Sequence, residues 1–176
     1  MSVRKFCKRV NTLKVYTILS LIAFCIAAIP NKTEASHAMG ADLAYTCLGN
    51  GQYALTLSFY RDCTGISAPT SATINMTSSC DTLIATLPLI SWVEISPICP
   101  TALSSCQGGT EPGVEQYIYS DTVSVSPCAD WIFSFSHCCR NPLITNLQTP
   151  SSHNIYIEAT LDNTGPDCNS SPIFTT

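Results

Sequence analysis

Basic residues are almost absent from the chain beyond residue 35. That part contains no lysine, and its two arginines, Arg61 and Arg140, stand against eleven acidic residues, which gives a net charge of −9. Nucleic acids and anionic lipid surfaces are bound through clustered cations. The composition therefore argues against nucleic acid as a partner, and it suits a bound cation such as calcium better.

Catalytic motifs are missing as well. His37, His137 and His153 are the only histidines, and there is no nucleophile elbow, metalloprotease helix motif or phosphate-binding loop. The run from His137 to Cys139 lacks the spacing of a zinc site, because no Cys-x2-Cys pair accompanies it. We predict that the chain is not an enzyme and has no catalytic residues. A secreted hydrolase, which would need two close carboxylates, is the least favoured alternative.

A long apolar run occurs only near the N-terminus. Residues 1–14 contain five basic residues and no acid, an apolar run follows from Val15 to Pro30, and the small residues Thr33 and Ala35 frame a cleavage site. This is the layout of a secretory signal peptide, and the run is short for a membrane span of about 20 residues. We predict a signal peptide over residues 1–35 and a secreted domain over 36–176 with no remaining membrane span; an uncleaved anchor is the alternative.

Cysteine is abundant in the predicted secreted domain. The candidates for disulfide bonds are Cys47, Cys63, Cys80, Cys99, Cys106, Cys128, Cys138, Cys139 and Cys168. In an exported chain this density indicates a disulfide framework. Because nine is odd, one thiol is free, bonds to another chain or bonds beyond Thr176, and we favour the last. Cys99 and Cys106 either close a local ring or both tie their loop to the sheet.

Hydrophobic alternation predicts about seven strands and no amphipathic helix. The strands are expected over residues 43–47, 53–59, 72–77, 83–87 and 89–95 with Pro88 marking an edge position or a bend, 116–125, 131–141 and 154–161. The predicted fold is an all-β, disulfide-stapled antiparallel β-sandwich of immunoglobulin-like or Greek-key type. The long connections Ser96–Glu115 and Asn141–Ser152 are the expected contact surfaces, since binding residues gather on loops.

The first two strands form a predicted hairpin around Gly49-Asn50-Gly51. A three-residue loop places Tyr53 opposite Cys47 and Leu55 opposite Tyr45, so that apolar side chains face each other. In this register Cys63 lies about 30 Å from Cys47, at about 3.4 Å per residue. We therefore predict that these two cysteines are not bonded to each other.

The stretch Trp131–Asn141 is predicted to form a central strand. Trp131, Phe133 and Phe135 alternate with serines, which gives the strand one buried face. Neighbouring residues of a strand point to opposite faces, so we expect Cys139 to bond inside the core and Cys138 on the other face; a bridge between the two is the alternative. Arg61 and Arg140 are each expected to have an acidic or carbonyl partner near the edge of the core.

Two binding sites can be suggested from the residue types alone. Asp162, Asp167 and Asn169 offer hard oxygen ligands for calcium after the last strand, although an Asx-rich turn explains them better. Their order loosely resembles the cadherin interdomain linker. Trp92, Tyr117 and Tyr119 are the candidate aromatic platform for stacking a sugar. No cofactor other than calcium is expected.

Several short stretches carry a family resemblance. They are Ser36-His37-Ala38-Met39-Gly40-Ala41-Asp42, Cys47-Leu48-Gly49-Asn50, Tyr60-Arg61-Asp62-Cys63, Cys138-Cys139-Arg140-Asn141 and Asn169-Ser170-Ser171-Pro172-Ile173-Phe174. Together they resemble the N-terminal domain of very large secreted surface proteins of Bacteroidota. Those proteins typically carry immunoglobulin-like or PKD-type repeats and often end in a gliding-motility-associated, type IX secretion sorting domain. Ala41 departs from the group, which usually has Gly there, and the chain ends before any repeat.

The resemblance implies a location on the cell surface and a further cysteine soon after Thr176. With the composition, it leads to a non-catalytic extracellular module of structural and adhesive function. Its expected partners are an extracellular glycan or protein ligand and downstream domains of the same chain. A carbohydrate-binding module is the alternative.

Overall fold

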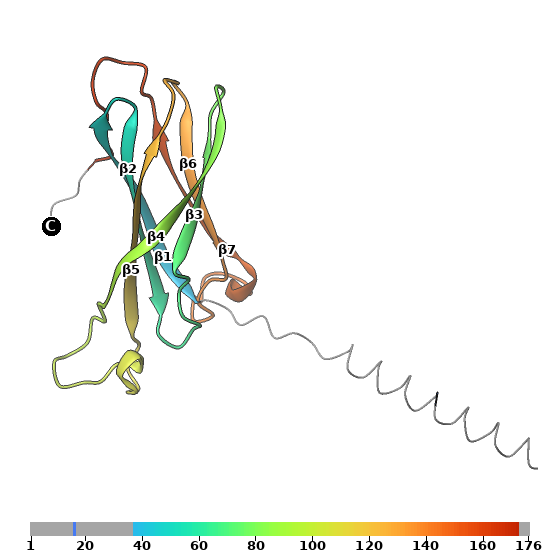
Figure 1. Ribbon diagram of the computed structural model, residues 1–176. Coiled ribbons are helices and arrows are strands. Elements are labelled where there is room, and N and C mark those ends of the chain that lie inside the picture. Colours follow the sequence, from blue (N-terminus) through green and yellow to red (C-terminus); the bar gives the residue numbers. More distant parts are fainter. Residues whose placement is uncertain (1–15, 17–36, 173–176) are drawn as a thin grey trace, which may run out of the picture. The chain divides into compact units, whose positions relative to one another are not determined.

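The computed structural model describes Tyr16 and residues 37–172, and residues 37–172 are mostly β-structure (Figure 1). The predicted signal peptide and the predicted start at Ser36 lie outside the described residues, apart from Tyr16. Within the described part, no helix has the length and apolar character needed to cross a membrane. The strands are β1 (Ala38–Gly49), β2 (Gln52–Asp62), β3 (Ser71–Thr77), β4 (Thr82–Glu94), β5 (Val114–Ser124), β6 (Trp131–Cys138) and β7 (Asn154–Leu161), with short 3-10 helices η1 (Ser105–Gln107) and η2 (Pro150–Ser152).

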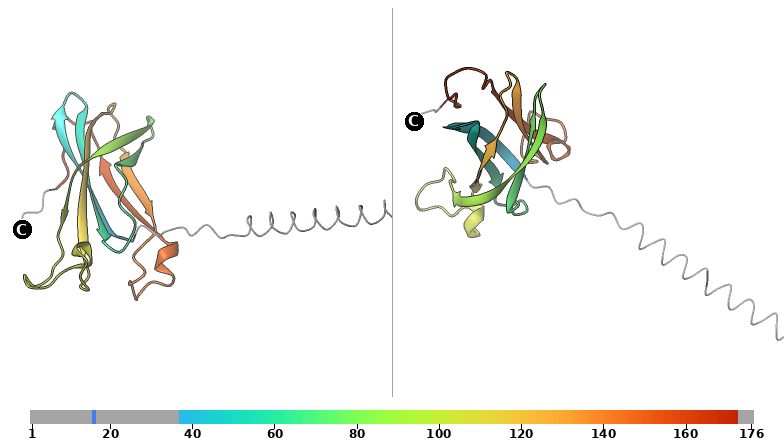
Figure 2. Two further views of the ribbon diagram at one scale, coloured as in Figure 1. Left: turned by 60° about the horizontal axis from the view of Figure 1, so that its bottom comes forward. Right: turned by 45° about the horizontal axis from the view of Figure 1, so that its top comes forward.

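All neighbouring strands pair antiparallel, in the order β1-β2-β5-β4-β3-β6-β7. Strand β4 is shared by both halves of the sheet, because Thr82–Pro88 pair with β3 and residues 89–94 with β5 (Figure 2). Pro88, the predicted bend, is thus where β4 changes partner. The groups β1-β2-β5-β4 and β3-β6-β7 have the strand order of an immunoglobulin constant domain. The predicted antiparallel all-β fold with about seven strands is confirmed.

The loops divide into two sets because every pairing is antiparallel. Residues 63–70, 95–113 and 139–153 follow β2, β4 and β6 and gather at one end of the sheet, which we call the loop end (bottom of Figure 1). The turns after β1, β3 and β5 gather at the opposite end, which we call the hairpin end. Both long connections predicted as contact surfaces are therefore at the loop end.

The predicted register of the first hairpin is confirmed. Tyr53 pairs with Cys47 and Leu55 with Tyr45, and a register shift at Leu48 takes up the extra residue of the loop. Gly49, Asn50 and Gly51 all have positive φ angles, of 90°, 54° and 73°. Glycine and asparagine tolerate this conformation best, so the Gly-Asn-Gly sequence fixes the turn and, through it, the register.

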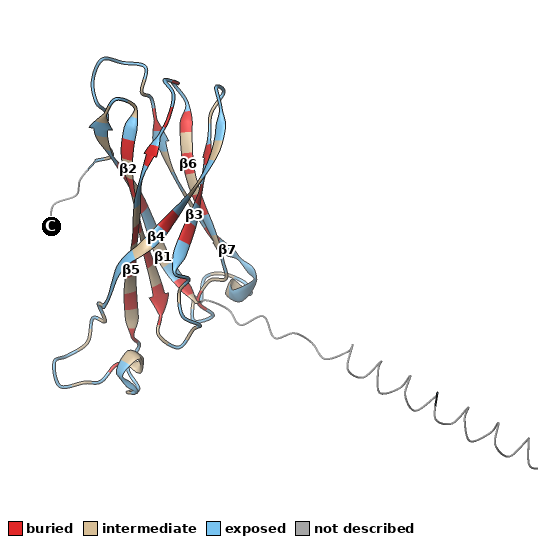
Figure 3. Ribbon diagram, in the orientation of Figure 1, coloured by how far each residue is buried: buried red, intermediate tan, exposed pale blue. Residues whose placement is uncertain are grey.

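The core consists of the alternating apolar side chains that the strands turn inward (Figure 3). Trp131 and Phe133 of β6 are fully buried, and Tyr45 of β1 contacts Phe133 edge-on, with ring centres 5.7 Å apart. The indole nitrogen of Trp131 donates a hydrogen bond to the carbonyl of Ser126 at 2.9 Å, so its burial leaves no polar atom unsatisfied. Truncating a buried aromatic residue of this kind to alanine costs about 3–5 kcal/mol.

The prediction for the two adjacent cysteines of β6 is wrong. Cys138 and Cys139 are bonded to each other rather than to partners on opposite faces. The alternation that separates neighbouring side chains holds only within a strand, and β6 ends at Cys138. Cys139 already belongs to the loop, where its carbonyl accepts a hydrogen bond from the backbone N–H of Ala38 at 3.0 Å.

Three further disulfides join segments that are distant in sequence. Cys47–Cys168 and Cys80–Cys128 lie toward the hairpin end, and Cys63–Cys106 lies at the loop end. Cys47 and Cys63 are not bonded to each other, as predicted. Neither alternative for Cys99 and Cys106 holds for both residues. η1 folds back onto the end of β2 and brings Cys106 to Cys63, with Cα atoms 5.0 Å apart, so Cys106 ties the loop to the sheet and Cys99 does not. Cys99 is the free, exposed thiol of the described residues.

The outer edge of β1 is covered at both of its ends. Toward its start, Ala38 exchanges backbone hydrogen bonds with Cys139 and Asn141. Toward its end, the backbone N–H groups of Tyr45 and Cys47 donate to the hydroxyls of Ser171 and Ser170, each at 2.9 Å. An uncovered edge strand invites pairing with other chains, so these contacts protect the sheet.

The disulfides should differ in their contribution to stability according to the loop that each closes. By the chain-entropy relation, loss of Cys47–Cys168, with a separation of 121 residues, costs about 5 kcal/mol, and loss of Cys63–Cys106, with a separation of 43, costs about 4 kcal/mol. Cys138–Cys139 closes no loop, so the C138S/C139S variant should stay within about 1 kcal/mol of the native protein on this account. Urea unfolding of the three double-serine variants measures the order; an equal loss in all three contradicts it.

His137, near the end of β6, is a half-buried residue beside the aromatic side chains of the core. Its ring stacks on Phe135 at 5.9 Å and meets Phe59 edge-on at 5.1 Å. Its Nε2 atom is buried and has no hydrogen-bond partner among the described residues. Burial lowers the pKa of His137 below its ordinary value, because a charged ring would lose its hydration there.

Acidification should therefore destabilise the fold through His137. The unfolded chain takes up a proton at the ordinary pKa of about 6.5, whereas the folded chain resists protonation to lower pH. The stabilisation by neutral His137 is therefore fully present above the pKa of the unfolded chain, and it is lost as the pH falls below that pKa. We expect the free energy of unfolding to drop between about pH 7.5 and 5.5, and less so in His137→Leu. His153→Gln, which alters an exposed histidine, is the control; an identical pH profile for His137→Leu and the native protein contradicts the assignment.

Candidate functional site

Three rows of side chains cross the inner face of β2, β5 and β4 on the way to the loop end. The register aligns Leu57, Tyr119 and Leu89 in the first row, Phe59, Tyr117 and Trp92 in the second, and Arg61, Glu115 and Glu94 in the third. The inner face thus changes from apolar to charged within four residues of β2 and β5 and within five residues of β4. The charged row is the candidate site.

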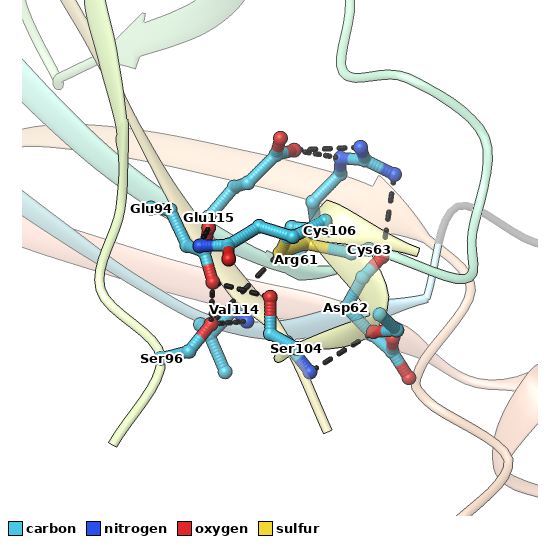
Figure 4. Close-up of a disulfide and its surroundings, with 12 residues drawn as sticks. Arg61, Asp62, Cys63, Glu94, Ser96, Ser104, Cys106, Val114 and Glu115 are labelled. Atoms are coloured by element: carbon cyan, nitrogen blue, oxygen red, sulfur yellow. Dashed lines mark hydrogen bonds and ion pairs between the residues drawn. A yellow bond between two sulfur atoms is a disulfide. The ribbon is translucent and has the colours of Figure 1, made fainter. Parts of the chain in front are cut away.

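Arg61 and Glu115 form a buried ion pair in the third row (Figure 4). Their exposed fractions are 6% and 8%, and Nη2 of Arg61 lies 2.6 Å from Oε2 of Glu115. The same carboxylate oxygen accepts hydrogen bonds from Nε of Arg61 at 2.9 Å and from the hydroxyl of Tyr117 at 2.8 Å. The guanidinium carbon is 5.9 Å from the centre of the Tyr117 ring, a cation–π contact.

Arg61 also fixes the loop that follows β2. Its Nη1 donates to the carbonyls of Gly65 at 2.7 Å and Ile66 at 2.9 Å. The prediction of an acidic or carbonyl partner is confirmed for Arg61, which has both kinds. Nε, Nη1 and Nη2 of Arg61 all have partners within the fold. Arg61 therefore stabilises the fold and does not bind a ligand.

Only part of the predicted aromatic platform is exposed. Trp92 is 60% exposed and stacks on Tyr117, with ring centres 6.3 Å apart and planes at 19°. Tyr117 and Tyr119 are buried, and burial raises the pKa of both hydroxyls, that of Tyr119 to about 12. The hydroxyl of Tyr119 donates to the carbonyl of Pro69 at 2.8 Å. Of the three residues, Trp92 alone offers a surface to a ligand.

Glu94, the third residue of the charged row, organises the connection between β4 and β5. Its carboxylate accepts hydrogen bonds from the hydroxyls of Ser96 at 2.6 Å and Ser104 at 2.5 Å, and from the amide of Gln107 at 2.9 Å. These donors, led by Ser104, lower the pKa of Glu94. Although Glu94 and Glu115 are cross-strand neighbours, their carboxylates serve different partners, as Figure 4 shows.

A groove lies between the end of β4 and this connection. It has a volume of about 470 Å³, and its lining includes Val93, Ile95, Cys99 and Leu103, so we call it the Cys99 groove. A second cavity of about 220 Å³, at the same end, is lined mainly by apolar groups of Met39, Leu143 and Ile144 beside Asp62 and Asn141. Each cavity contains one carboxylate, that of Glu94 or Asp62.

Of the predicted calcium ligands, Asp162 has hydrogen-bond partners within the fold. The carboxylate of Asp162 accepts hydrogen bonds from the backbone N–H and the hydroxyl of Thr164, at 2.9 and 2.7 Å, which is an Asx turn. Neither Asp162 nor Asp167 belongs to a described group of three potential metal-ligating side chains. The two groups that the described residues do form each contain a disulfide pair, whose sulfur atoms are not thiolate ligands.

The stretches that carry the family resemblance come together in space. At the loop end, Asp62 accepts a hydrogen bond from the side chain of Asn141 at 3.0 Å and donates its backbone N–H to the carbonyl of His37 at 3.1 Å. Toward the hairpin end, Cys47 is joined to the segment that contains Ser170. These residues therefore hold chain segments together, which is a structural role.

The sequence reasoning did not identify Glu115 and Glu94 as members of a site. Glu115, Tyr117 and Tyr119 are alternate residues of one strand, so their side chains lie on the same face. This alternation could have placed Glu115 on the inner face beside a cation. No protein-family model matches the chain, and neither a curated protein nor a solved structure shows significant similarity to it.

Removing the counter-charge of Arg61 should strongly destabilise the protein. Glu115→Ala leaves a buried guanidinium without its carboxylate, which costs about 3–5 kcal/mol. Glu111→Ala removes an exposed acid from the neighbouring loop and should change the stability by less than about 0.5 kcal/mol. Urea unfolding compares the two. A loss below about 1 kcal/mol for Glu115→Ala would show that the pair does not hold the loop end together.

Proposed function

We propose that the chain is a non-catalytic extracellular module with a structural and adhesive function. The observation that carries the proposal is the construction of the loop end. Two long loops meet there, and large apolar side chains remain exposed on them, including Leu103 at 59% and Leu143 at 70%. Exposed apolar side chains on loops held by a rigid sheet are typical of protein-binding surfaces.

The charged groups at this end support a role without catalysis. Arg61, Glu115 and Glu94 all have partners within the fold, and so has Asp62. A general acid or base must instead have an atom that is free to exchange a proton with the substrate at hydrogen-bond distance. The site therefore favours a scaffold over a hydrolase.

The disulfides support a location in an oxidising compartment. Four pairs involve eight of the nine cysteines in the described residues, a density found in secreted and surface proteins. Together with the resemblance to N-terminal domains of large Bacteroidota surface proteins, this leads us to propose that the domain is exported and presented at the cell surface, with further domains after it.

A carbohydrate-binding module is the second candidate. Trp92 favours it, because its exposed ring is held in place by Tyr117 and could stack on a sugar. A single aromatic side chain provides a small platform, so this candidate is weaker than protein adhesion.

Ligand arrays with a matched pair of variants test the proposal. The oxidised, secreted protein is applied to immobilised extracellular proteins and glycans. We expect binding that Leu143→Asp weakens at least tenfold, since a charge replaces an apolar contact at the loop end. Ile84→Asp, at an equally exposed position (69%) toward the hairpin end, should bind normally.

The outcomes separate the candidates. Absence of binding to every array member, or an equal loss in both variants, contradicts the adhesive proposal. Binding to glycans that is abolished only by Trp92→Ala identifies the carbohydrate-binding candidate instead.

A further inference from the structure

We propose that the smaller cavity of the loop end, which we call the Asp62 cavity, binds the alkylammonium group of a lysine side chain on a partner protein. That the partner is a protein rests on the proposed adhesive function. The ammonium chemistry rests on the cavity itself, which combines apolar walls with a buried carboxylate that has no counter-charge.

The walls of the Asp62 cavity come from segments that are distant in sequence. Met39 at the start of β1, Pro112 just before β5, and Leu143 and Ile144 after β6 supply its apolar lining. Met39 and Leu143 are 47% and 70% exposed, so apolar groups are accessible at its rim. Its volume of about 220 Å³ is below the range of about 300–1,000 Å³ that is typical of pockets for drug-sized ligands, and it suits a single side chain.

The carboxylate of Asp62 is held in this cavity by neutral donors. Asp62 is 6% exposed, and its Oδ1 accepts hydrogen bonds from the backbone N–H and the hydroxyl of Thr64, at 2.8 and 3.0 Å. Its Oδ2 accepts one from the side-chain amide of Asn141 at 3.0 Å. A carboxylate has about four acceptor positions, so Oδ2 keeps one for a further donor.

The folded domain does not supply a cation for Asp62. All lysines of the chain lie within residues 1–35, the predicted signal peptide. The one ion pair among the described residues joins Arg61 to Glu115, so neither Arg61 nor Arg140 pairs with Asp62. A buried carboxylate without a counter-charge is costly, and a cation brought by another molecule would offset that cost.

The geometry suits an ammonium group better than other cations. Calcium takes about six to eight oxygen ligands, which the apolar walls do not offer. A guanidinium is matched best by two free carboxylate oxygens, and Oδ1 of Asp62 already accepts two hydrogen bonds. An ammonium group is a compact charge that can bond to Oδ2 alone, while the methylene groups of lysine lie against the apolar walls.

A titration of the full secreted chain with n-butylammonium chloride, followed by nuclear magnetic resonance, tests the site. The chain is oxidised and isotope-labelled, and about 0.15 M sodium chloride screens the exposed charges. We expect saturable shifts of the side-chain amide of Asn141 and of the methyl groups of Met39 and Ile144. n-Butanol, which has the same length and no charge, should bind at least tenfold more weakly.

Variants separate the contributions of the charge and of the cavity. Asp62→Asn should bind n-butylammonium at least tenfold more weakly, with little change for n-butanol. Met39→Trp narrows the rim and leaves the carboxylate intact; it should also weaken binding at least tenfold, and it tests the site even if Asp62→Asn does not fold. Leu48→Trp, at a similarly exposed position (54%) of the same strand near the hairpin end, is the matched control and should bind normally.

A short peptide tests the assignment to a protein lysine. Acetyl-Gly-Lys-Gly-amide should shift the same signals, and its Nε-acetylated form, which has lost the charge, should not. Equal affinity for n-butylammonium and n-butanol, shifts spread evenly over the acidic surface, or a lysine peptide that does not bind would overturn the proposal. Failure of the adhesive function is seen separately, as absence of binding on the ligand arrays while the amine still binds beside Asp62.

Discussion

The buried ion pair between Arg61 and Glu115 is the interaction on which the loop end depends. A buried guanidinium is costly unless a carboxylate and further acceptors surround it, and Arg61 has both. Its contacts connect β2 to β5 and to the loop of residues 63–70. The neighbouring Cys63–Cys106 bond extends this connection to η1, and Glu94 orders the rest of the same loop. The loops of residues 63–70 and 95–113 thereby acquire one defined arrangement.

This arrangement gives the two ends of the sheet different properties. The hairpin end has short turns and two disulfides nearby, and the segment that follows β7 returns to cover the edge of β1. The loop end has the long loops, the two cavities and many of the exposed apolar side chains. The edge of β1 is covered toward both of its ends. The proposed adhesive function would use the loop end.

Local sequence patterns predicted the strands and the first hairpin well, for a physical reason. Apolar alternation fixes which side chains face inward, and the Gly49-Asn50-Gly51 turn leaves one register that pairs apolar residues. The disulfide pairing could not be predicted in the same way. Cys106 meets Cys63 only because η1 folds back on β2, and the Cys138–Cys139 bond depends on the strand ending between its two cysteines.

The candidate site was only partly predictable. Alternation placed Tyr117 and Tyr119 on one face of β5, but it could not show that this face is buried. In β4 a register shift at Ile90 places Leu89 and Trp92 on the same face although three positions separate them, and no residue pattern reveals such a shift. A partner was expected for Arg61. That this partner is Glu115 depends on the pairing of β2 with β5, and alternation within a single strand does not reveal which strands pair.

Native-state amide hydrogen exchange tests the central claim most directly, namely that Arg61, Glu115 and Cys63–Cys106 make the loop end a rigid platform. The backbone amides of Ser105, Gly109 and Gly113 donate hydrogen bonds within the loop after β4, so they should exchange nearly as slowly as those of the strands. Exchange of these amides at the rate of an unstructured peptide, while the strands stay protected, would contradict the account.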